Sequence, residues 1–163
     1  MNVIFLDIDG VLNHNEFYNK RLTLDNIQNK PYPYNNFDPD AIGYLNDIIA
    51  VTNAKIVISS SWRFDKNIIK ILKNVGVCGD IIGVTPSLEH IYGSLCRGKE
   101  IDAYLAKHNN IKNYVILDDD NDMEPHQLEH FVKTNENEDG LNSKCRNLAI
   151  EILLHNKKSK IYM

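Results

Sequence analysis

The stretch Val3-Ile4-Phe5-Leu6-Asp7-Ile8-Asp9-Gly10 decides how this sequence of 163 residues is interpreted. Four consecutive apolar residues lead directly into two acids and a glycine, without the alternation that marks a half-exposed strand. A short, continuous apolar run is typical of a strand that is buried on both faces of a parallel sheet. We therefore expect a strand over residues 3–6 that ends at a pair of carboxylates.

Other apolar runs along the chain have the same form, and each one ends in polar residues. These runs are residues 56–58, 81–82, 114–117 and, more weakly, 131–132. Helical patterns separate or follow them at residues 38–49, 68–76, 100–108 and 142–153. Because strands alternate with helices, the sequence predicts an α/β fold, a three-layer α/β/α Rossmann-like domain with a mainly parallel sheet.

The length of the chain favours one domain over residues 1–163. Residues 13–37 interrupt the alternation, and they are rich in Asn, Tyr and Pro, so we expect a loop or small flap inserted there. The insertions are too short for a large cap. The flap also carries cations and aromatics, a mixture that can bind nucleic acid. The same mixture is ordinary loop composition, and we favour that interpretation.

Composition excludes several classes of function. The sequence has no apolar run of membrane-spanning length, so we expect no membrane partner. Three cysteines without a CxxC spacing argue against disulfides and zinc and favour a cytoplasmic protein with reduced thiols. The net charge of -4 gives no overall attraction to nucleic acid. The oligomeric state is left open by the sequence.

Polar residues that follow the predicted strands include carboxylates and hydroxyls, and two cations just precede the helix at 100–108. In an open α/β sheet, ligands bind at the carboxyl ends of the strands, where the strand order switches. These side chains should therefore converge around one crevice. The set is Asp7, Asp9, Ser59, Ser60, Ser61, Arg97, Lys99, Asp118, Asp119 and Asp120.

Clustered carboxylates repel one another unless a cation binds between them. Oxygen ligands without a nearby His or Cys suit a hard ion, most simply Mg²⁺. A carboxylate held beside a phosphate can attack it in line and form an aspartyl phosphate. Hydroxyls and a cation can bind the equatorial oxygens, while a second carboxylate protonates the leaving group and then activates water.

Residues 5–12, Phe-Leu-Asp-Ile-Asp-Gly-Val-Leu, resemble the first motif of the haloacid dehalogenase (HAD) superfamily, an apolar strand followed by DxDG[TV]. Residues 56–61 resemble the second motif, Arg97-Gly98 the third, and residues 115–119 the fourth. All four occur in the family's order and together cover about residues 3–122. The resemblance implies the parallel strand order 5-4-1-2-3.

A narrower resemblance is carried by Ser60-Ser61-Trp62-Arg63 and by the later Gly140-Leu141, which precedes a helix. These segments are similar to those of the small, minimally capped HAD domains grouped with RNA-repair proteins. The resemblance also implies roles for the acids. Asp7 would be the nucleophile and a metal ligand, and Asp9 would be the acid/base residue with its backbone carbonyl on the metal. Asp119 would complete the Mg²⁺ site. Asp118 would orient the basic residue and would also be a metal ligand.

The remaining motif positions concern the phosphate. Ser60 would bind it, with Ser59 as the alternative because three consecutive serines leave the register open. Arg97 would fill the basic position, which is usually Lys in the family, with Lys99 as the second candidate. Further candidates for substrate binding are Gly10, Ser61 and Arg63. Trp62-Arg63 is also open to another interpretation, a packed Trp beside a solvated Arg.

The expected function is a Mg²⁺-dependent phosphatase, a phosphoric monoester hydrolase that acts through an aspartyl phosphate. Its partner would be a phosphorylated substrate, either a small molecule or a polynucleotide end. The alternatives are a non-catalytic HAD-like binding or regulatory module, and a phosphotransferase to an acceptor other than water. Residues 118–129 also resemble a calcium-binding EF-hand loop, but Met123 stands where that loop needs Gly, and a strand precedes it.

Overall fold

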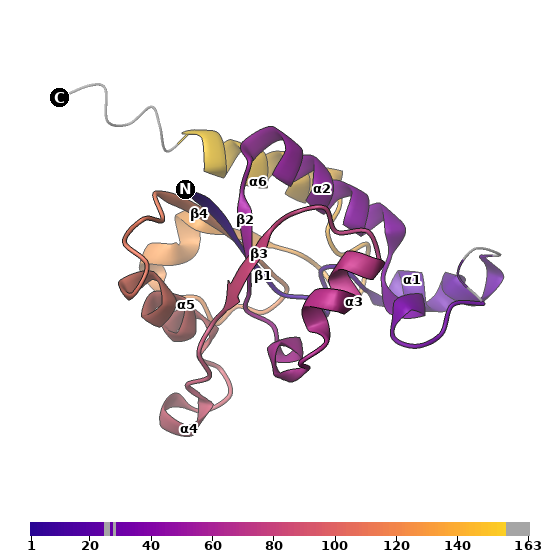
Figure 1. The fold of residues 1–163 in the computed structure, drawn as a ribbon, viewed down its shortest axis with the longest axis horizontal. Coiled ribbons are helices and arrows are strands. Elements are labelled where there is room, and N and C mark those ends of the chain that lie inside the picture. Colours follow the sequence, from indigo (N-terminus) through magenta and orange to yellow (C-terminus); the bar gives the residue numbers. More distant parts are fainter. Residues whose placement is uncertain (25–26, 28, 156–163) are drawn as a thin grey trace.

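The structure is a computed structural model, and it describes residues 1–24, 27 and 29–155. Five strands form one sheet in the order β3-β2-β1-β4-β5, and every neighbouring pair is parallel (Figure 1). The strands are β1 (Asn2–Leu6), β2 (Lys55–Ile58), β3 (Ile81–Val84), β4 (Asn113–Asp118) and β5 (Phe131–Lys133). The predicted fold class and the strand order implied by the resemblance are both confirmed. The first strand of the chain therefore lies at the centre of the sheet.

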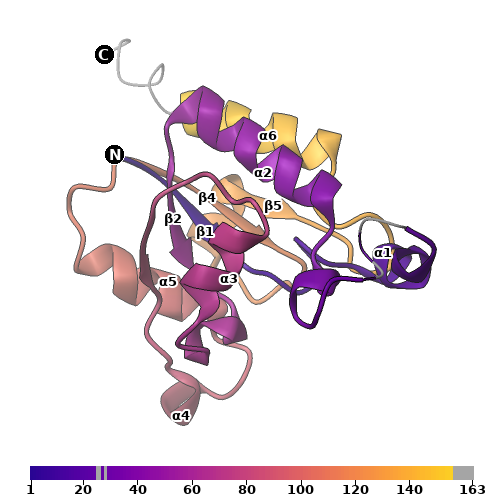
Figure 2. The same ribbon diagram turned by 45° about the vertical axis from the view of Figure 1, so that its right-hand side comes forward.

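Helices cover both faces of the sheet. In Figure 2, α2 and α6 lie side by side over one face, and α5 lies on the other side of the sheet. The helices are α1 (Asn15–Lys20), α2 (Pro39–Thr52), α3 (Ile68–Asn74), α4 (Glu89–Tyr92), α5 (Arg97–Ala106) and α6 (Ser143–His155). Short 3₁₀ helices are η1 (Arg21–Thr23), η2 (Tyr34–Asn36), η3 (Ser61–Phe64) and η4 (Pro125–His130). None of the described helices has the length and apolar character that crossing a bilayer requires.

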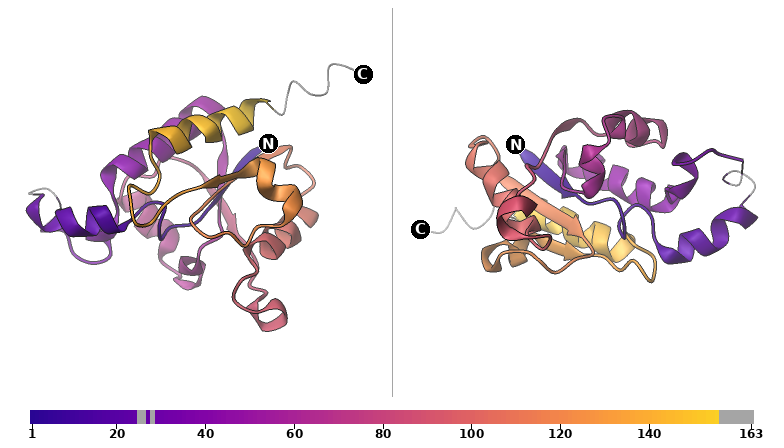
Figure 3. Two further views of the ribbon diagram at one scale, coloured as in Figure 1. Left: turned by 180° about the vertical axis from the view of Figure 1, so that it is seen from behind. Right: turned by 90° about the horizontal axis from the view of Figure 1, so that it is seen from below.

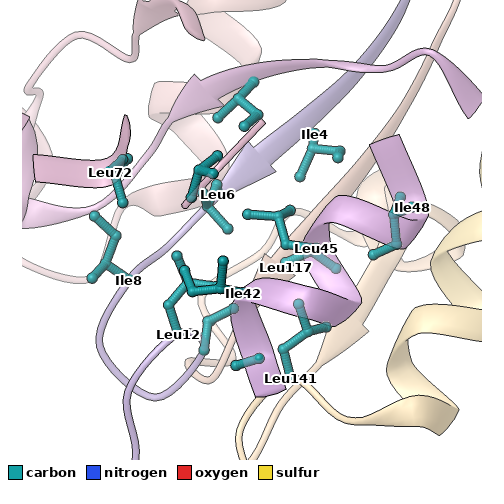
Figure 4. Close-up of a cluster of buried hydrophobic side chains, with 14 of the residues drawn as sticks. Ile4, Leu6, Ile8, Leu12, Ile42, Leu45, Ile48, Leu72, Leu117 and Leu141 are labelled. Atoms are coloured by element: carbon teal, nitrogen blue, oxygen red, sulfur yellow. The ribbon is translucent and has the colours of Figure 1, made fainter. Parts of the chain in front are cut away.

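The residues of β1 alternate between two hydrophobic clusters. Ile4 and Leu6 pack in the larger cluster with residues of α2, α3 and α6, part of which is shown in Figure 4. Val3 and Phe5 point to the opposite face, where Phe5 packs edge-on against Tyr104 of α5 at 5.7 Å between ring centroids. Both faces of the strand are buried, and this accounts for the continuous apolar run at its position in the sequence.

The start of α5 differs from the prediction. The helix begins at Arg97, three residues before the expected start at Glu100. Asp122, which follows β4, supplies the acceptors for the first turn. Its carboxylate accepts from the Arg97 backbone N–H at 2.8 Å, and its carbonyl accepts from that of Gly98 at 3.1 Å. The cap comes from a distant part of the chain, so local sequence gave no signal for it.

The insertion at 13–37 contains α1, η1 and η2 where a loop or flap was expected. His14 caps α1 through its side chain and lies 2.6 Å from the Asp38 carboxylate at the N-terminus of α2. Phe17 of α1 is buried. The insertion is therefore attached to the domain at both ends, while α1 extends to one side of the sheet and its helices (Figures 1 and 3).

Candidate active site

Three carboxylates meet at the carboxyl edge of the sheet. Leu6 of β1 pairs with Leu117 of β4, so Asp7, the next residue after β1, lies beside Asp118. The Asp7 backbone N–H continues this pairing by donating to the Leu117 carbonyl at 3.0 Å. Oxygens from Asp7, Asp118 and Asp119 all lie within 4.8 Å of one another. We call these three residues the acidic centre.

Gly10 makes room for the acidic centre. Its φ of +74° lies in the left-handed region, and a Cβ at this position would lie 2.4 Å from Cγ of Asp119. A distant segment supports the same turn. Thr134 donates its hydroxyl to the Gly10 carbonyl at 2.8 Å, and the Leu141 N–H donates to the Val11 carbonyl at 2.9 Å. Only glycine fits the turn without displacing the Asp119 carboxylate.

Arg97 reaches the acidic centre from the N-terminus of α5. Its Nη1 lies 3.6 Å from Oδ1 of Asp7, and its Nε lies 3.6 Å from Oδ2 of Asp118. Lys99 lies apart from these acids, with its Nζ 2.8 Å from Oε1 of Glu124 and its ammonium over the Tyr92 ring. Of the two candidate cations, Arg97 is the one that the fold brings to the acids.

The acidic centre carries more negative charge than Arg97 balances. Burial, and then the charge of Asp7, raise the pKa of Asp118 to about 8. The same two causes raise the pKa of Asp119 to about 6. Burial also raises the pKa of Asp7, although Arg97 acts in the opposite direction. Three buried or partly buried carboxylates with one guanidinium form an environment that favours a further cation.

The residues present fit a hard divalent cation. Oδ2 of Asp118 is buried and has no hydrogen-bond partner in the part of the chain that the structure describes. All the side-chain donors of the acidic centre are carboxylate oxygens, which are the ligands that Mg²⁺ prefers. Asp7, Asp119 and Asp118 could therefore hold the ion that the sequence predicts.

The three serines after β2 have different environments. Ser60 is fully buried, and its Oγ accepts from the Trp62 backbone N–H at 3.3 Å. The Ser60 side chain lowers the pKa of the Asp7 carboxyl against the larger effect of burial. Ser59 is also fully buried, and its Oγ has no partner among the described residues. Ser61 begins η3 and is exposed. Ser60 is the serine that contacts the predicted nucleophile.

The Asp9 carboxylate is held by two donors that sequence reasoning had not assigned. Oδ2 accepts from Nε1 of Trp62 at 2.9 Å, and Oδ1 accepts from Nδ2 of Asn13 at 2.8 Å. Asp9 itself is exposed, and its side chain is not part of the acidic centre. The sequence leaves open whether Trp62 contacts substrate or is a packed residue, and nothing in the sequence pattern indicates the role of Asn13.

Arg63 is not brought to the acids. Its side chain is almost completely buried, with Nη2 2.8 Å from Oε1 of Glu100 and Nη1 donating to the Ser59 carbonyl at 3.0 Å. This pair joins the serine segment to α5, the helix that carries Arg97. A charged residue on the apolar face of the helix at 100–108 was the available signal for Glu100. We therefore leave Arg63 out of the substrate-contacting set.

The EF-hand interpretation of residues 118–129 is wrong. Asp118 ends a strand of the parallel sheet, whereas an EF-hand loop follows a helix. Asp118 also accepts from the Asp120 N–H at 3.0 Å and turns its other oxygen toward Arg97. The acids of this segment therefore belong to the edge of the sheet.

The site combines the features of a HAD-like domain. These are an acid-glycine turn after the first strand, serines after the second, a cation at the start of a helix and an acid pair after the fourth strand. Over residues 3–144 the sequence matches the family described as "HAD domain in Swiss Army Knife RNA repair proteins". The chain belongs to this family. No curated protein and no solved structure matches it.

Proposed function

We propose that this protein is a Mg²⁺-dependent phosphatase that forms an aspartyl phosphate on Asp7, and that its substrates are nucleic-acid or nucleotide phosphates. The observation that carries the proposal is the convergence of Asp7, Asp118 and Asp119 within 4.8 Å, beside Arg97, at one edge of the sheet. Three free thiols accord with a cytoplasmic location, which is part of the proposal.

In the first step, an Asp7 carboxylate oxygen attacks the phosphorus, and the bond from phosphorus to the leaving oxygen breaks. Ser60 and Arg97, which both contact Asp7, orient the carboxylate and offer donors to the phosphoryl oxygens. A Mg²⁺ ion held by Asp7, Asp119 and Asp118 would neutralise phosphate charge and keep these carboxylates ionised.

Asp9 supplies the proton transfers in this scheme. It gives a proton to the leaving oxygen in the first step and takes one from water in the second. The water oxygen then bonds to phosphorus, and the bond from phosphorus to Asp7 breaks, which regenerates the carboxylate and releases phosphate. Donors from Trp62 and Asn13 fix both oxygens of Asp9, so the carboxyl is oriented before substrate binds.

The substrate class is supported by two observations. The matched family is described as belonging to RNA repair proteins, and this points to a nucleotide or a polynucleotide end. The described residues of the insertions between the motifs form only short helices, and none of them builds a large cap that would exclude a polymer. A phosphatase screen with 3′- and 5′-phosphorylated oligonucleotides beside small metabolites tests this part directly.

The catalytic proposal is tested by Asp7→Asn. We expect hydrolysis of an aryl phosphate with Mg²⁺ to fall by about a thousandfold or more, because the amide is a poor nucleophile. Asp80→Asn is the matched control, since Asp80 is exposed and pairs with Lys55 at the other end of the sheet. An Asp7→Asn variant with retained activity would overturn the assignment.

The same preparation separates the alternatives. A folded wild-type protein that hydrolyses none of the phosphoesters but binds RNA or protein would be a non-catalytic module. Transfer of phosphate to an added alcohol or nucleoside, detected by product analysis, would identify a phosphotransferase.

A further inference from the structure

One cleft among the described residues borders the acidic centre, another is lined by Trp62, which bonds to Asp9, and their linings differ in chemistry. One, of about 470 Å³, is walled by residues that include Asp119, Asp120 and Glu136. The other, of about 350 Å³, lies between the insertion and the start of α3. Its walls include Tyr32, Tyr34, Trp62, Asp65, Asn67 and Lys70. We call the second one the aromatic cleft, and its size falls in the range of small-molecule sites, roughly 300–1,000 Å³.

Trp62 connects the aromatic cleft to the proposed acid/base residue. The indole Nε1 donates to Asp9 at 2.9 Å, while the same side chain lines the cleft. Phe37 packs edge-on against the indole at 5.6 Å between ring centroids, and this contact fixes the plane of the ring. The cleft therefore begins one indole ring away from the Asp9 carboxylate.

The chemistry of the first step decides which cleft holds the leaving group. Asp9 must reach the leaving oxygen, so the group attached to that oxygen extends on the Asp9 side of the phosphate. Trp62, which donates to Asp9 on that side, also lines the aromatic cleft. The lining of the other cleft has three acids, Asp119, Asp120 and Glu136, against the cation Lys133, so its net negative charge repels a nucleotide. In the lining of the aromatic cleft, the charges of Asp65 and Lys70 balance.

The lining of the aromatic cleft suits a flat heteroaromatic group. Tyr32 is 73% exposed, so its ring is available for stacking, and Trp62 is half-buried with its position fixed. Asn67 and Asp65 offer hydrogen-bonding groups for the edge of a base, and Lys70 offers a cation for a further phosphate. Stacking of bases on aromatic side chains is tolerant of sequence, and it contributes about 1–3 kcal/mol for each base.

On the basis of the proposed function, we propose that the aromatic cleft binds the nucleobase of the nucleotide whose phosphate is attacked by Asp7. Tyr32 and Trp62 provide the stacking surfaces. The ligand is a nucleotide unit, either free or at the end of a polynucleotide. The cleft thus selects nucleotides, and the acidic centre performs the reaction.

Binding can be measured without turnover because Trp62 is the single tryptophan of the chain. In the Asp7→Asn variant with Mg²⁺, adenosine 3′-monophosphate and adenosine 5′-monophosphate are titrated against tryptophan fluorescence. We expect saturable quenching by at least one isomer and none by ribose 5-phosphate, which lacks the base. Tyr32→Ala should raise the dissociation constant measured by this quenching about fivefold to a hundredfold, and Tyr32→Phe should keep the wild-type value.

Kinetics give the second readout. With Asp7 intact, Tyr32→Ala should raise KM for the better nucleotide isomer about fivefold to a hundredfold, and kcat/KM should fall by the same factor. The variant should leave hydrolysis of ribose 5-phosphate unchanged, and Tyr32→Phe should behave as wild type. Matched 3′- and 5′-phosphorylated oligonucleotides then show whether the preferred source is a free nucleotide or a polynucleotide end.

The two proposals fail in different ways. Quenching that depends on the base and on Tyr32, without hydrolysis of any phosphoester, would support the base site and contradict the phosphatase. Hydrolysis with no base-dependent quenching, or with equal losses for nucleotide and ribose phosphate in Tyr32→Ala, would overturn the base site and leave the phosphatase standing.

Discussion

The acidic centre and the aromatic cleft, which the hydrogen bond from Trp62 to Asp9 links, are built differently. The acidic centre follows β1 and β4, two paired strands in the middle of the sheet, and Asp7 and Asp118 are buried. The aromatic cleft is built from the insertion, from η3 and from the start of α3, and its outer wall, Tyr32, is 73% exposed.

The difference follows from what each region is proposed to do, since the acidic centre would perform the reaction and the aromatic cleft would recognise the substrate. Buried carboxylates with a shared cation need positions that are fixed to a fraction of an ångström, and paired strands provide them. An aromatic wall for a base tolerates more movement because a stacking contact is less directional. Substitutions in the acidic centre should therefore lower kcat for every substrate, while substitution of the outer cleft wall at Tyr32 should act through KM for nucleotides alone.

After Asp7→Asn, the largest effect is expected from Arg97→Met. Loss of the guanidinium removes charge stabilisation of the phosphoryl group, so kcat should fall by about a hundredfold to a thousandfold for nucleotide and ribose phosphate alike. Lys99→Met is the matched control, because Lys99 pairs with Glu124, and its rate should stay within about twofold of wild type. Steady-state kinetics on both variants decide between the two cations, and a larger loss in Lys99→Met would transfer the role.

A second large effect concerns pH and Mg²⁺. Protons and metal compete for the same carboxylates. With the pKa of Asp118 at about 8 and that of Asp119 at about 6, Mg²⁺ affinity should fall by about one to two orders of magnitude from pH 8 to pH 6. Isothermal titration calorimetry at several pH values measures this dependence.

The same groups change the stability of the metal-free protein with pH. Their pKa values are raised in the folded state above the ordinary 3.8. Their contribution to stability is therefore complete below that value and is lost as pH rises through about 6 and about 8. We compare the melting temperatures of the metal-free wild-type protein and the metal-free Asp118→Asn variant at pH 5.5 and at pH 8.5. The melting temperature of the wild type, relative to that of the variant, should be lower at pH 8.5 than at pH 5.5. An unchanged difference would show that Asp118 is already ionised in the folded state.

A smaller effect is expected from Gly10→Ala. The new Cβ would meet Asp119 at 2.4 Å in a left-handed backbone, so the carboxylate must move, and Mg²⁺ affinity should fall by about tenfold or more. Gly43→Ala is the control within α2, where a Cβ has open space. It should leave metal affinity unchanged and raise stability by roughly 0.5–1 kcal/mol in thermal or urea unfolding.

The smallest effect is expected from Trp62→Phe, which alters the link between the two regions. Phenylalanine keeps an aromatic wall beside Phe37 but removes the indole donor to Asp9, so kcat should fall about fivefold to tenfold. Nucleotide KM should change little. In an Asp9→Asn background the same substitution should have no further effect on kcat, and an independent loss there would contradict the positioning role.

The fold was accessible from the sequence because its signals are local. The buried faces of β1 and β4 appear as continuous apolar runs, and Asp38-Pro39 marks the start of α2 as an N-cap and first helical residue. Parallel order then brings the strand ends together. Asp7, Asp118 and Asp119 could be placed at one edge from these signals and the HAD resemblance alone.

Other parts of the site depend on contacts between distant segments. Glu100 neutralises Arg63 across a gap of 37 residues, and Trp62 reaches Asp9 across 53. The start of α5 at Arg97 depends on Asp122. No periodicity or motif encodes such pairs, so sequence alone left the register of the serines and the role of Arg63 open.

The position of β1 also affects how the protein forms during synthesis. Strand β1 comes first in the order of this sheet's strands along the chain and lies at the sheet's centre, yet its partners β2 and β4 follow after tens of residues. The Gly10 turn receives its supports from Thr134 and Leu141. In a nascent chain, Asp7 is therefore synthesised long before the contacts that fix its position, and the site can form only after residues 134–141 have emerged.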